Sequence, residues 1–415
     1  MNEIHDIPKD WKCLILKKLI TQDIKNGYSP NCPEEPNGSW ILSLGNLTEN
    51  GFDPSQVKPA PKDDMRVQDF LLEPGDFLIS RSNTLDKVGR TMLFRGEIEN
   101  CSYPDLLMKF RVDETQVTNE YLEEYLRSSI VRTYIQRCAS GTSGSMVKIN
   151  KTAVEKIPVV LPTLPEQKAI ADLLSTWDEA IEKTERLIQV KERRFKRMLN
   201  DLIHQGRSNH TWKGFNLSDL CVPVSRKNTE NNTNVLTSSA LNGLVSQIEY
   251  YNKSVSAEDV TGYYLLKKGE FAYNRSSAKG YPYGATKRLD RYEKGVLSTL
   301  YLCFALKPDA PCESDFLLHL FESGVANREL RAVCQEGARS HGLLNITKGD
   351  FFGIKLFLPS QEQQKKIQSA LNTSQYEIDL LKRLADQYKT QKRGLMQRVL
   401  TGIWRMAPDA VMRYE

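Results

Sequence analysis

A chain of 415 residues is too long for one ordinary hydrophobic core, so we expect two to four structural units. Hydrophobic residues make up 40% and charged residues 26%, which is typical of soluble globular protein. The sequence contains no run of about 18 apolar residues, so we expect no membrane span. The formal net charge of +5 permits nucleic-acid binding but does not require it.

The sequence indicates neither a targeting signal nor a metal site. Residues 1–10 contain no apolar segment of a signal peptide, so we expect a cytoplasmic protein. The eight cysteines form no CxxC pair, which predicts reduced and mostly buried thiols. The five histidines lack the spacing of zinc ligands, so we expect no metal in this chain.

Residues 1–160 are expected to form a mixed α/β domain. Short β-type runs at residues 40–44, 77–80 and 107–112 are separated by Gly, Pro and Asn turns. Residues 119–137 are amphipathic and predict one helix whose apolar face joins the core.

Two loops of this domain carry side chains that suit DNA recognition. Residues 81–90 follow the predicted strand at 77–80, and residues 141–148 follow the predicted helix. Arg and Lys suit phosphates and guanine, Asn suits adenine, and Ser and Thr suit either. The candidate DNA contacts are Arg81, Ser82, Asn83, Thr84, Lys87, Arg90, Thr142, Ser143, Ser145 and Lys148. Such loops are also common as plain connections, and that alternative stays open here.

Residues 166–203 lack proline and glycine and predict one long helix. Its apolar positions recur at alternating steps of four and three, which is the heptad seam of a coiled coil, although Thr184 and Lys191 interrupt it. The basic run at 193–197 is expected to be either a solvated face or a docking surface for another subunit. The residues expected to pack against a partner helix are Ile170, Leu174, Trp177, Ile181, Ile188 and Phe195.

The second half of the chain repeats the first at an offset close to 195 residues. Corresponding turns, prolines and helix starts recur with small changes of offset, from 194 to 197 in the two longest matches. The matching segments are residues 74–82 with 268–276, residues 161–170 with 358–367, and Trp11-Lys12 with Trp212-Lys213. Such a period describes two copies of one domain plus one helical segment.

The second copy supplies a predicted helical stretch at 314–336, similar loops and a second long helix with the same seam spacing. Its candidate DNA contacts are Arg275, Ser276, Ser277, Lys279, Tyr281, Arg339, Ser340 and His341. Its expected packing residues are Ile367, Leu371, Ile378, Leu381, Tyr388 and Leu395.

We expect the two long helices to pack against each other, because a single amphipathic helix is marginal in water. The predicted fold is therefore α+β with a pseudo-two-fold internal repeat, in which two globular α/β domains are separated by two long antiparallel coiled-coil helices. An intermolecular coiled coil is the competing interpretation. A helix of about 38 residues spans roughly 57 Å, which suits a spacer between two DNA-reading domains.

The expected boundaries are residues 1–160 and 207–357 for the globular domains, and 161–206 and 358–415 for the helical spacers and the C-terminal tail. The helical segments match well between copies, whereas the globular halves match only at framework turns. This contrast predicts a shared scaffold with two different reading surfaces, because a palindrome would need the same reading residues twice.

Together these motifs resemble the specificity (S) subunit of type I DNA restriction-modification systems over essentially the whole chain. The resemblance is carried by the repeated Trp-Lys pairs, the Gly-Asp/Glu-Phe turns, the Glu/Gln-Gln-Lys-x-x-Ile helix starts and the end of the second helix. These stand at residues 11–12 and 212–213, 75–77 and 269–271, 166–170 and 363–367, and 394–402.

The resemblance implies that each globular half is a target-recognition domain for one half of an asymmetric DNA site. It implies that the helices set the spacing of the half-sites and dock the modification subunits, two in number, which carry S-adenosylmethionine and methylate adenine. Restriction subunits that use ATP and Mg²⁺ join them. The chain itself is expected to bind double-stranded DNA, to hold no cofactor and to catalyse nothing.

The residues themselves indicate no catalytic centre. The chain has no glycine-rich cofactor loop in a strand–turn–helix context and no Asn-Pro-Pro-Tyr/Phe motif. We interpret Asp105 as a turn residue, and Glu166 as a residue that favours a helix N-terminus. A coiled-coil scaffold that tethers protein partners without DNA is the alternative function, and an independent nuclease or methyltransferase is a more remote one.

Overall fold

The computed structural model describes residues 7–49, 51–141, 146–205, 212–239, 243–251, 259–278, 280–336 and 344–415. The chain divides into two compact units, which we call unit 1 (Met1–Thr184 with Arg383–Glu415) and unit 2 (Glu185–Lys382). Each unit holds a globular domain and a stretch of both long helices. In the described part of the chain, no helix is long and apolar enough to cross a membrane.

The domain of unit 1 is built around a four-stranded sheet with the order β2-β11-β7-β9. A separate antiparallel pair, β1 with β13, joins the start of the domain to its end, with Lys12 opposite Leu161. The strands of these sheets are β1 (Lys12–Ile15), β2 (Lys25–Asn26), β7 (Phe77–Ser80), β9 (Thr91–Leu93), β11 (Leu107–Phe110) and β13 (Pro158–Leu161).

Short strands and helices surround this central sheet. A second, three-stranded sheet has the order β10-β3-β6, and the pairs β4-β5 and β8-β12 complete the strands. These strands are β3 (Trp40–Ile41), β4 (Leu47–Thr48), β5 (Gly51–Phe52), β6 (Lys58–Pro59), β8 (Ser82–Asn83), β10 (Cys101–Ser102) and β12 (Val147–Lys148). The helices are α1 (Met65–Gln68), α2 (Asn119–Arg127), α3 (Ser129–Cys138) and α4 (Lys151–Glu155).

Unit 2 has the same central framework. Its four-stranded sheet has the order β15-β22-β19-β20, and β14 pairs with β25 so that Lys213 lies opposite Leu358. These strands are β14 (Lys213–Asn216), β15 (Cys221–Pro223), β19 (Phe271–Asn274), β20 (Ala285–Arg288), β22 (Leu302–Leu306) and β25 (Lys355–Leu358).

The remaining elements of unit 2 differ from those of unit 1. Its additional strands form three separate antiparallel pairs, β16-β17, β18-β21 and β23-β24. They are β16 (Leu236–Ser239), β17 (Gly243–Ser246), β18 (Tyr264–Lys267), β21 (Lys294–Leu297), β23 (Gln335–Glu336) and β24 (Leu344–Asn345). The helices are α7 (Leu217–Leu220), α8 (Gln247–Tyr251), α9 (Ser314–Glu322), α10 (Asn327–Val333) and α11 (Lys348–Gly353).

The packing of the two cores confirms the internal repeat. Phe77 stacks on Phe110 in unit 1 with ring centroids 5.2 Å apart, and Phe271 stacks on Phe304 in unit 2 at the same 5.2 Å. Both pairs are related by the offset of 194 residues. The α+β class and the pseudo-two-fold repeat were therefore predicted correctly from the sequence.

Two predicted helical stretches are each broken into two helices. The stretch at 119–137 divides at Ser128, whose hydroxyl accepts a hydrogen bond from the backbone N–H of Val131 and so caps α3. The stretch at 314–336 divides between α9 and α10 at Gly324, which has a positive φ of 72°. The prediction of one helix in each copy was wrong for these local reasons.

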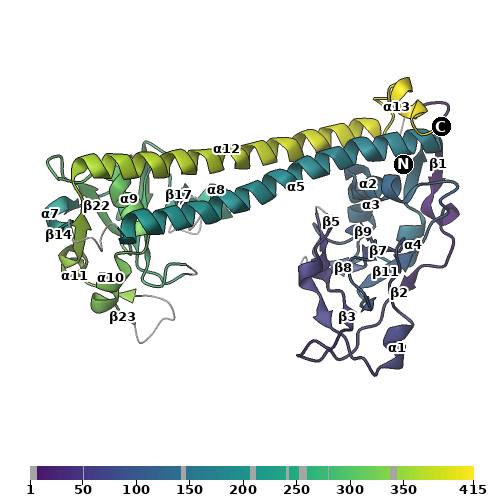
Figure 1. The fold of residues 1–415 in the computed structure, drawn as a ribbon, viewed down its shortest axis with the longest axis horizontal. Coiled ribbons are helices and arrows are strands. Elements are labelled where there is room, and N and C mark those ends of the chain that lie inside the picture. The colour runs from purple at the N-terminus through teal and green to yellow at the C-terminus, as the bar shows by residue number, and fades with distance from the viewer. Residues whose placement is uncertain are drawn as a thin grey trace. The chain divides into compact units, whose positions relative to one another are not determined.

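The two long helices are α5 (Leu164–Asn200) and α12 (Gln361–Val399), and they run alongside each other in both units (Figure 1). A short π-helical turn, Asp201–Gln205, extends α5, and α13 (Pro408–Met412) lies in the tail. In unit 1 the first part of α5 meets the last part of α12, as in the edge-to-face pair of Trp177 and Tyr388. In unit 2 the last part of α5 meets the first part of α12, as in the ion pair of Lys191 and Glu377. The helices are therefore antiparallel partners within one chain.

Candidate nucleic-acid interface

The two loops predicted to recognise DNA lie next to each other in unit 1. Strand β8 at the start of the first loop pairs with β12 at the end of the second, so that Ser82 lies opposite Lys148. The backbone N–H of Ile149 also donates to the carbonyl oxygen of Arg81 at 2.9 Å. The segments around Ser82 and Val147, which are 65 residues apart in the sequence, therefore lie side by side.

Unit 2 repeats this junction with different side chains. The backbone N–H of Leu344 donates to the carbonyl oxygen of Arg275 at 2.8 Å, which is the counterpart of the bond between Ile149 and Arg81. Strands β23 and β24 flank the second loop, as β12 does in unit 1. The same framework thus brings equivalent loops together in both copies.

Four polar side chains of the unit 1 loops are at least partly exposed. Lys87 and Lys148 are exposed, and Arg81 and Asn83 are half-buried. Among the described residues, the side chains of Arg81, Lys87 and Lys148 take part in no hydrogen bond or ion pair. They are available for phosphates or base edges.

Other candidates hold the structure together instead. Ser82 is 1% exposed and its hydroxyl donates to the carbonyl oxygen of Val147, so we correct its assignment from a DNA contact to a link between the loops. Arg90 donates to the carbonyl oxygen of Leu47. Thr84 contributes its backbone carbonyl oxygen to the turn that follows it.

In unit 2, Tyr281 is engaged within the domain. Its hydroxyl donates to the Glu322 carboxylate at 2.6 Å and accepts from Lys287 at 2.9 Å, and burial raises its pKa. Arg275 donates to the carbonyl oxygen of Leu300, although it remains half-buried. Ser276 is half-buried and Ser277 is exposed. The remaining candidates, Thr142, Ser143, Ser145, Lys279, Arg339, Ser340 and His341, lie outside the described residues.

Comparison with known proteins shows which proteins this chain is similar to. Residues 8–192 match the model of the "Type I restriction modification DNA specificity domain". The chain is 24% identical over 422 residues to the MjaX type I restriction enzyme specificity subunit of Methanocaldococcus jannaschii, covering 96% of this chain and 95% of that protein. The MjaVIII specificity subunit of the same organism is 26% identical over 211 residues, covering 49% of this chain and 47% of that protein.

The chain is thus similar to specificity subunits of type I restriction enzymes, and residues 8–192 match their DNA specificity domain.

A crystal structure of the S subunit of a type I restriction-modification system from M. genitalium has the same fold. It superimposes with a TM-score of 0.54 over 96% of this chain and 98% of that one, at 13% sequence identity. The likeness confirms the specificity-family fold that the repeated motifs predicted.

The repeated helix-start motif has a structural role that its sequence did not reveal. The Gln167 amide is fully buried, accepts from the backbone N–H of Thr118 at 2.9 Å and donates to two backbone carbonyl oxygens. Gln364 does the same in unit 2, accepting from the backbone N–H of Glu313 at 2.8 Å. Each glutamine fixes the start of a long helix to the segment that precedes a domain helix, α2 in unit 1 and α9 in unit 2.

Glu166 does more than favour a helix N-terminus. It is 3% exposed and accepts from the Trp11 indole N–H at 3.0 Å and from the Arg405 guanidinium at 2.8 Å. Arg405 also pairs with Asp10, and this hydrogen bond lowers the pKa of that carboxyl. Trp11 of the repeated Trp-Lys pair therefore contacts both the start of α5, through Glu166, and the C-terminal tail, through Arg405.

The predicted seam residues of the helix pair lie as follows. Six are buried and six are half-buried. The buried ones are Ile170, Leu174, Ile181, Ile188, Leu371 and Ile378; the half-buried ones are Trp177, Phe195, Ile367, Leu381, Tyr388 and Leu395. In unit 1 the core includes Ile170 and Leu174 together with Val399 of α12, and in unit 2 it includes Leu199 together with Leu371.

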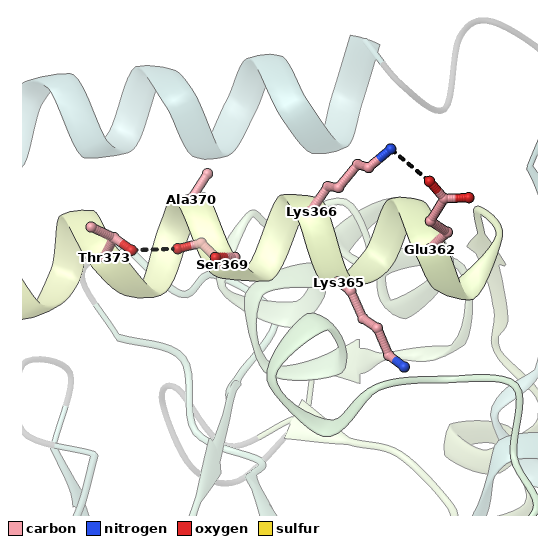
Figure 2. A pocket seen from close by; sticks show the side chains of 6 residues that line it. All are labelled: Glu362, Lys365, Lys366, Ser369, Ala370 and Thr373. Atoms are coloured by element: carbon pink, nitrogen blue, oxygen red, sulfur yellow. Dashed lines mark hydrogen bonds and ion pairs between the residues drawn. The ribbon is translucent and has the colours of Figure 1, made fainter.

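A shallow hollow lies on α12 in unit 2. Figure 2 shows its lining, in which Lys366 pairs with Glu362 at 2.7 Å and Thr373 donates to the carbonyl oxygen of Ser369. Lys365, which also lines the hollow, pairs instead with Glu313 of the domain at 3.6 Å. Among the described residues, no group of three His, Cys, Asp or Glu side chains is placed to hold a metal ion.

Proposed function

We propose that this chain is the DNA specificity subunit of a type I restriction-modification complex and that it reads a bipartite, asymmetric DNA site. In this proposal residues 1–160 and 207–357 are the two target-recognition domains. Residues 161–206 and 358–415 contain the helices that set the spacing between the half-sites.

The observation that carries the proposal is the repeated junction of two loops. Both units join their loops by the same backbone bond, from Ile149 to Arg81 and from Leu344 to Arg275, yet the side chains around these bonds differ. A shared framework with different surface residues is what two unlike half-sites require.

In unit 1 we assign DNA contacts to the exposed or half-buried side chains of Arg81, Asn83, Lys87 and Lys148. Arg275, Ser276 and Ser277 are the corresponding candidates in unit 2. Arg and Lys neutralise phosphates or read guanine, and Asn and Ser read base edges. The predicted loop residues that lie outside the described part remain candidates on sequence grounds.

The chain itself acts by binding, without catalysis, in the cytoplasm. Two modification subunits supply S-adenosylmethionine and methylate adenine, and restriction subunits use ATP and Mg²⁺. The similarity to type I restriction enzyme specificity subunits supports this division of labour.

A selection experiment tests the proposal. The full chain, combined with its modification subunits, is used to select from a random-sequence duplex library, and two conserved half-sites separated by a fixed spacer are expected. The affinity should fall steeply with salt, about a thousandfold between 50 and 200 mM for six neutralised phosphates. The salt slope is the slope of log affinity against log salt concentration. The variant Lys87→Gln should reduce the size of this slope by about one, the value of one phosphate contact. Lys168→Gln, at an exposed position on α5, should leave the slope unchanged. If the complex selects no sequence and its binding is insensitive to salt, the alternative function of a scaffold for protein partners is favoured.

A further inference from the structure

The first recognition loop of unit 1 contains a single helical turn whose end is held by a half-buried cation. The backbone N–H groups of Lys87 and Val88 both donate to the carbonyl oxygen of Thr84, at 2.9 and 2.8 Å. A helical turn leaves its last carbonyl oxygens without partners inside the turn. Something outside the loop must therefore satisfy them.

Arg132 of α3 supplies the missing donors. Its guanidinium donates to the carbonyl oxygens of Val88, Asp86 and Leu85, the latter two at 3.0 and 3.4 Å. The ion pairs found in the described part of unit 1 do not include Arg132, so its bonded partners are three backbone carbonyls of one turn. A cation at the C-terminal end of a helical turn is stabilised there. A planar guanidinium can bind several carbonyls at once, which a lysine ammonium does less well.

A second contact from the same face of α3 fixes the loop one residue later. Gly89 has a φ of 72°, and a Cβ atom built on it would lie 2.5 Å from Cγ2 of Ile135. Ile135 stands one turn after Arg132 on α3, and Val88 is fully buried beside it in the core. The return of the loop is therefore held closely against α3, while Lys87 on the turn is exposed.

We propose that Arg132 is a positioning residue for DNA recognition: it holds the turn at residues 84–88 so that Arg81, Asn83 and Lys87 face one half-site in a fixed geometry. This inference rests on the proposed function. Arg132 itself touches no base, because its guanidinium is occupied by the loop backbone.

Unit 2 offers a matched comparison, because its equivalent loop is held by a different charged group. The Glu322 carboxylate of α9 accepts from the Tyr281 hydroxyl at 2.6 Å and from the Lys287 ammonium at 2.5 Å. Lys287 is 5% exposed, so this anchor is more deeply buried than the half-buried Arg132 of unit 1. A variant at Glu322 should therefore disturb the other half-site.

The experiment measures base discrimination separately at the two half-sites. The full chain with its modification subunits is bound to its selected duplex and to duplexes with one base pair changed. Arg132→Gln is expected to reduce the discrimination at one half-site by about tenfold, the value of one good base contact, and to leave the other half-site unchanged. Glu322→Gln should show the reverse pattern, and Arg132→Lys should fall between the wild type and Arg132→Gln.

Two results would overturn the inference. In one, Arg132→Gln retains full discrimination at both half-sites. In the other, it weakens both half-sites equally and lowers the melting temperature, which is the behaviour of a purely structural residue. Failure of the proposed function itself is recognisable beforehand, since the wild-type complex would then select no duplex sequence.

Discussion

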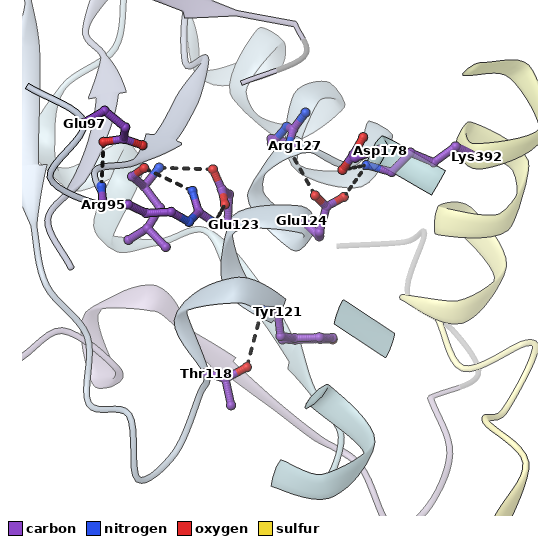
Figure 3. Close-up of polar contacts among 10 residues, drawn as sticks. Arg95, Glu97, Thr118, Tyr121, Glu123, Glu124, Arg127, Asp178 and Lys392 are labelled. Carbon is purple, nitrogen blue, oxygen red and sulfur yellow. Dashed lines mark hydrogen bonds and ion pairs between the residues drawn. The ribbon is translucent and has the colours of Figure 1, made fainter. Parts of the chain in front are cut away.

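The ammonium of Lys392 on α12 lies 2.9 Å from the carboxylate of Glu124 on α2, and both side chains are more than 90% buried. The same ammonium pairs with Asp178 on α5 at 2.6 Å, and Arg127 supports Glu124 from the other side at 3.1 Å (Figure 3). A lysine at a seam position of a coiled coil is thus matched by two carboxylates, one from the partner helix and one from the domain.

At the equivalent position in unit 2 the contact is between two rings and not between two charges. Phe195 precedes Lys392 by 197 residues and His319 follows Glu124 by 195, which are the offsets of the repeat. Their rings meet edge to face, with centroids 6.3 Å apart. The domain and the helix pair therefore meet through an ion pair in one unit and through two rings in the other. In each unit, the domain side chain is therefore chemically complementary to the helix side chain that it contacts.

Replacing Lys392 with methionine should destabilise unit 1. The variant leaves the Glu124 carboxylate buried with Arg127 as its remaining cation, so we expect a loss of about 2 kcal/mol, below the ~3–5 kcal/mol of a fully isolated buried charge. Urea unfolding followed by circular dichroism measures it. Lys382→Met, which removes the exposed pair with Glu192, is the control and should cost less than about 1 kcal/mol. Equal losses in the two variants would refute the role of burial.

His319 should make the stability of unit 2 depend on pH. Burial lowers the pKa of His319 and Arg288 lowers it further, whereas the hydrogen bond to Asn372 and the charges of Asp315 and Glu322 act in the opposite direction. The unfolded chain therefore binds the proton first, so the stabilisation is complete above about pH 6.5 and is lost as the pH falls through the lowered folded-state pKa. Melting temperatures from pH 5 to 8 should fall more steeply with acid for the wild type than for His319→Gln. Parallel curves would show that His319 does not titrate on unfolding.

Periodic features were predictable from the sequence, whereas contacts across long separations were not. The alternating steps of four and three join ten seam positions in each helix and predicted both α5 and α12, because a helix displays its own period. The pairing of Lys392 with Glu124 joins residues 268 positions apart, and no local pattern in either segment encodes it. In the loops, residue types indicated a polar surface, but the inward direction of Ser82 depends on its pairing with the strand at Val147.

Gln167 should be far more sensitive to substitution than its polarity suggests. Truncation in Gln167→Ala leaves the backbone N–H of Thr118 buried without its acceptor, which should cost about 2 kcal/mol. Hydrogen exchange should show faster exchange of the Thr118 amide, with unit 2 unaffected; Gln364→Ala should produce the mirror result at Glu313. Gln189→Ala, at an exposed position on α5, is expected to change stability by less than about 0.5 kcal/mol. The proposed role of the buried glutamine is wrong if Gln167→Ala is equally mild.

Matched insertions into the two helices test whether their length determines the DNA spacer. Unit 1 ends at Thr184 on α5 and begins again at Arg383 on α12, so seven residues added after Thr184 and seven after Lys382 preserve the heptad register on both helices. Each insertion adds about 10.5 Å of helix, so the preferred spacer should lengthen by about three base pairs. An insertion in α5 alone places its seam out of step with that of α12 and should lower the melting temperature. Duplex selection with the doubly extended chain gives the spacer directly, and an unchanged spacer would mean that the helix pair does not act as a ruler.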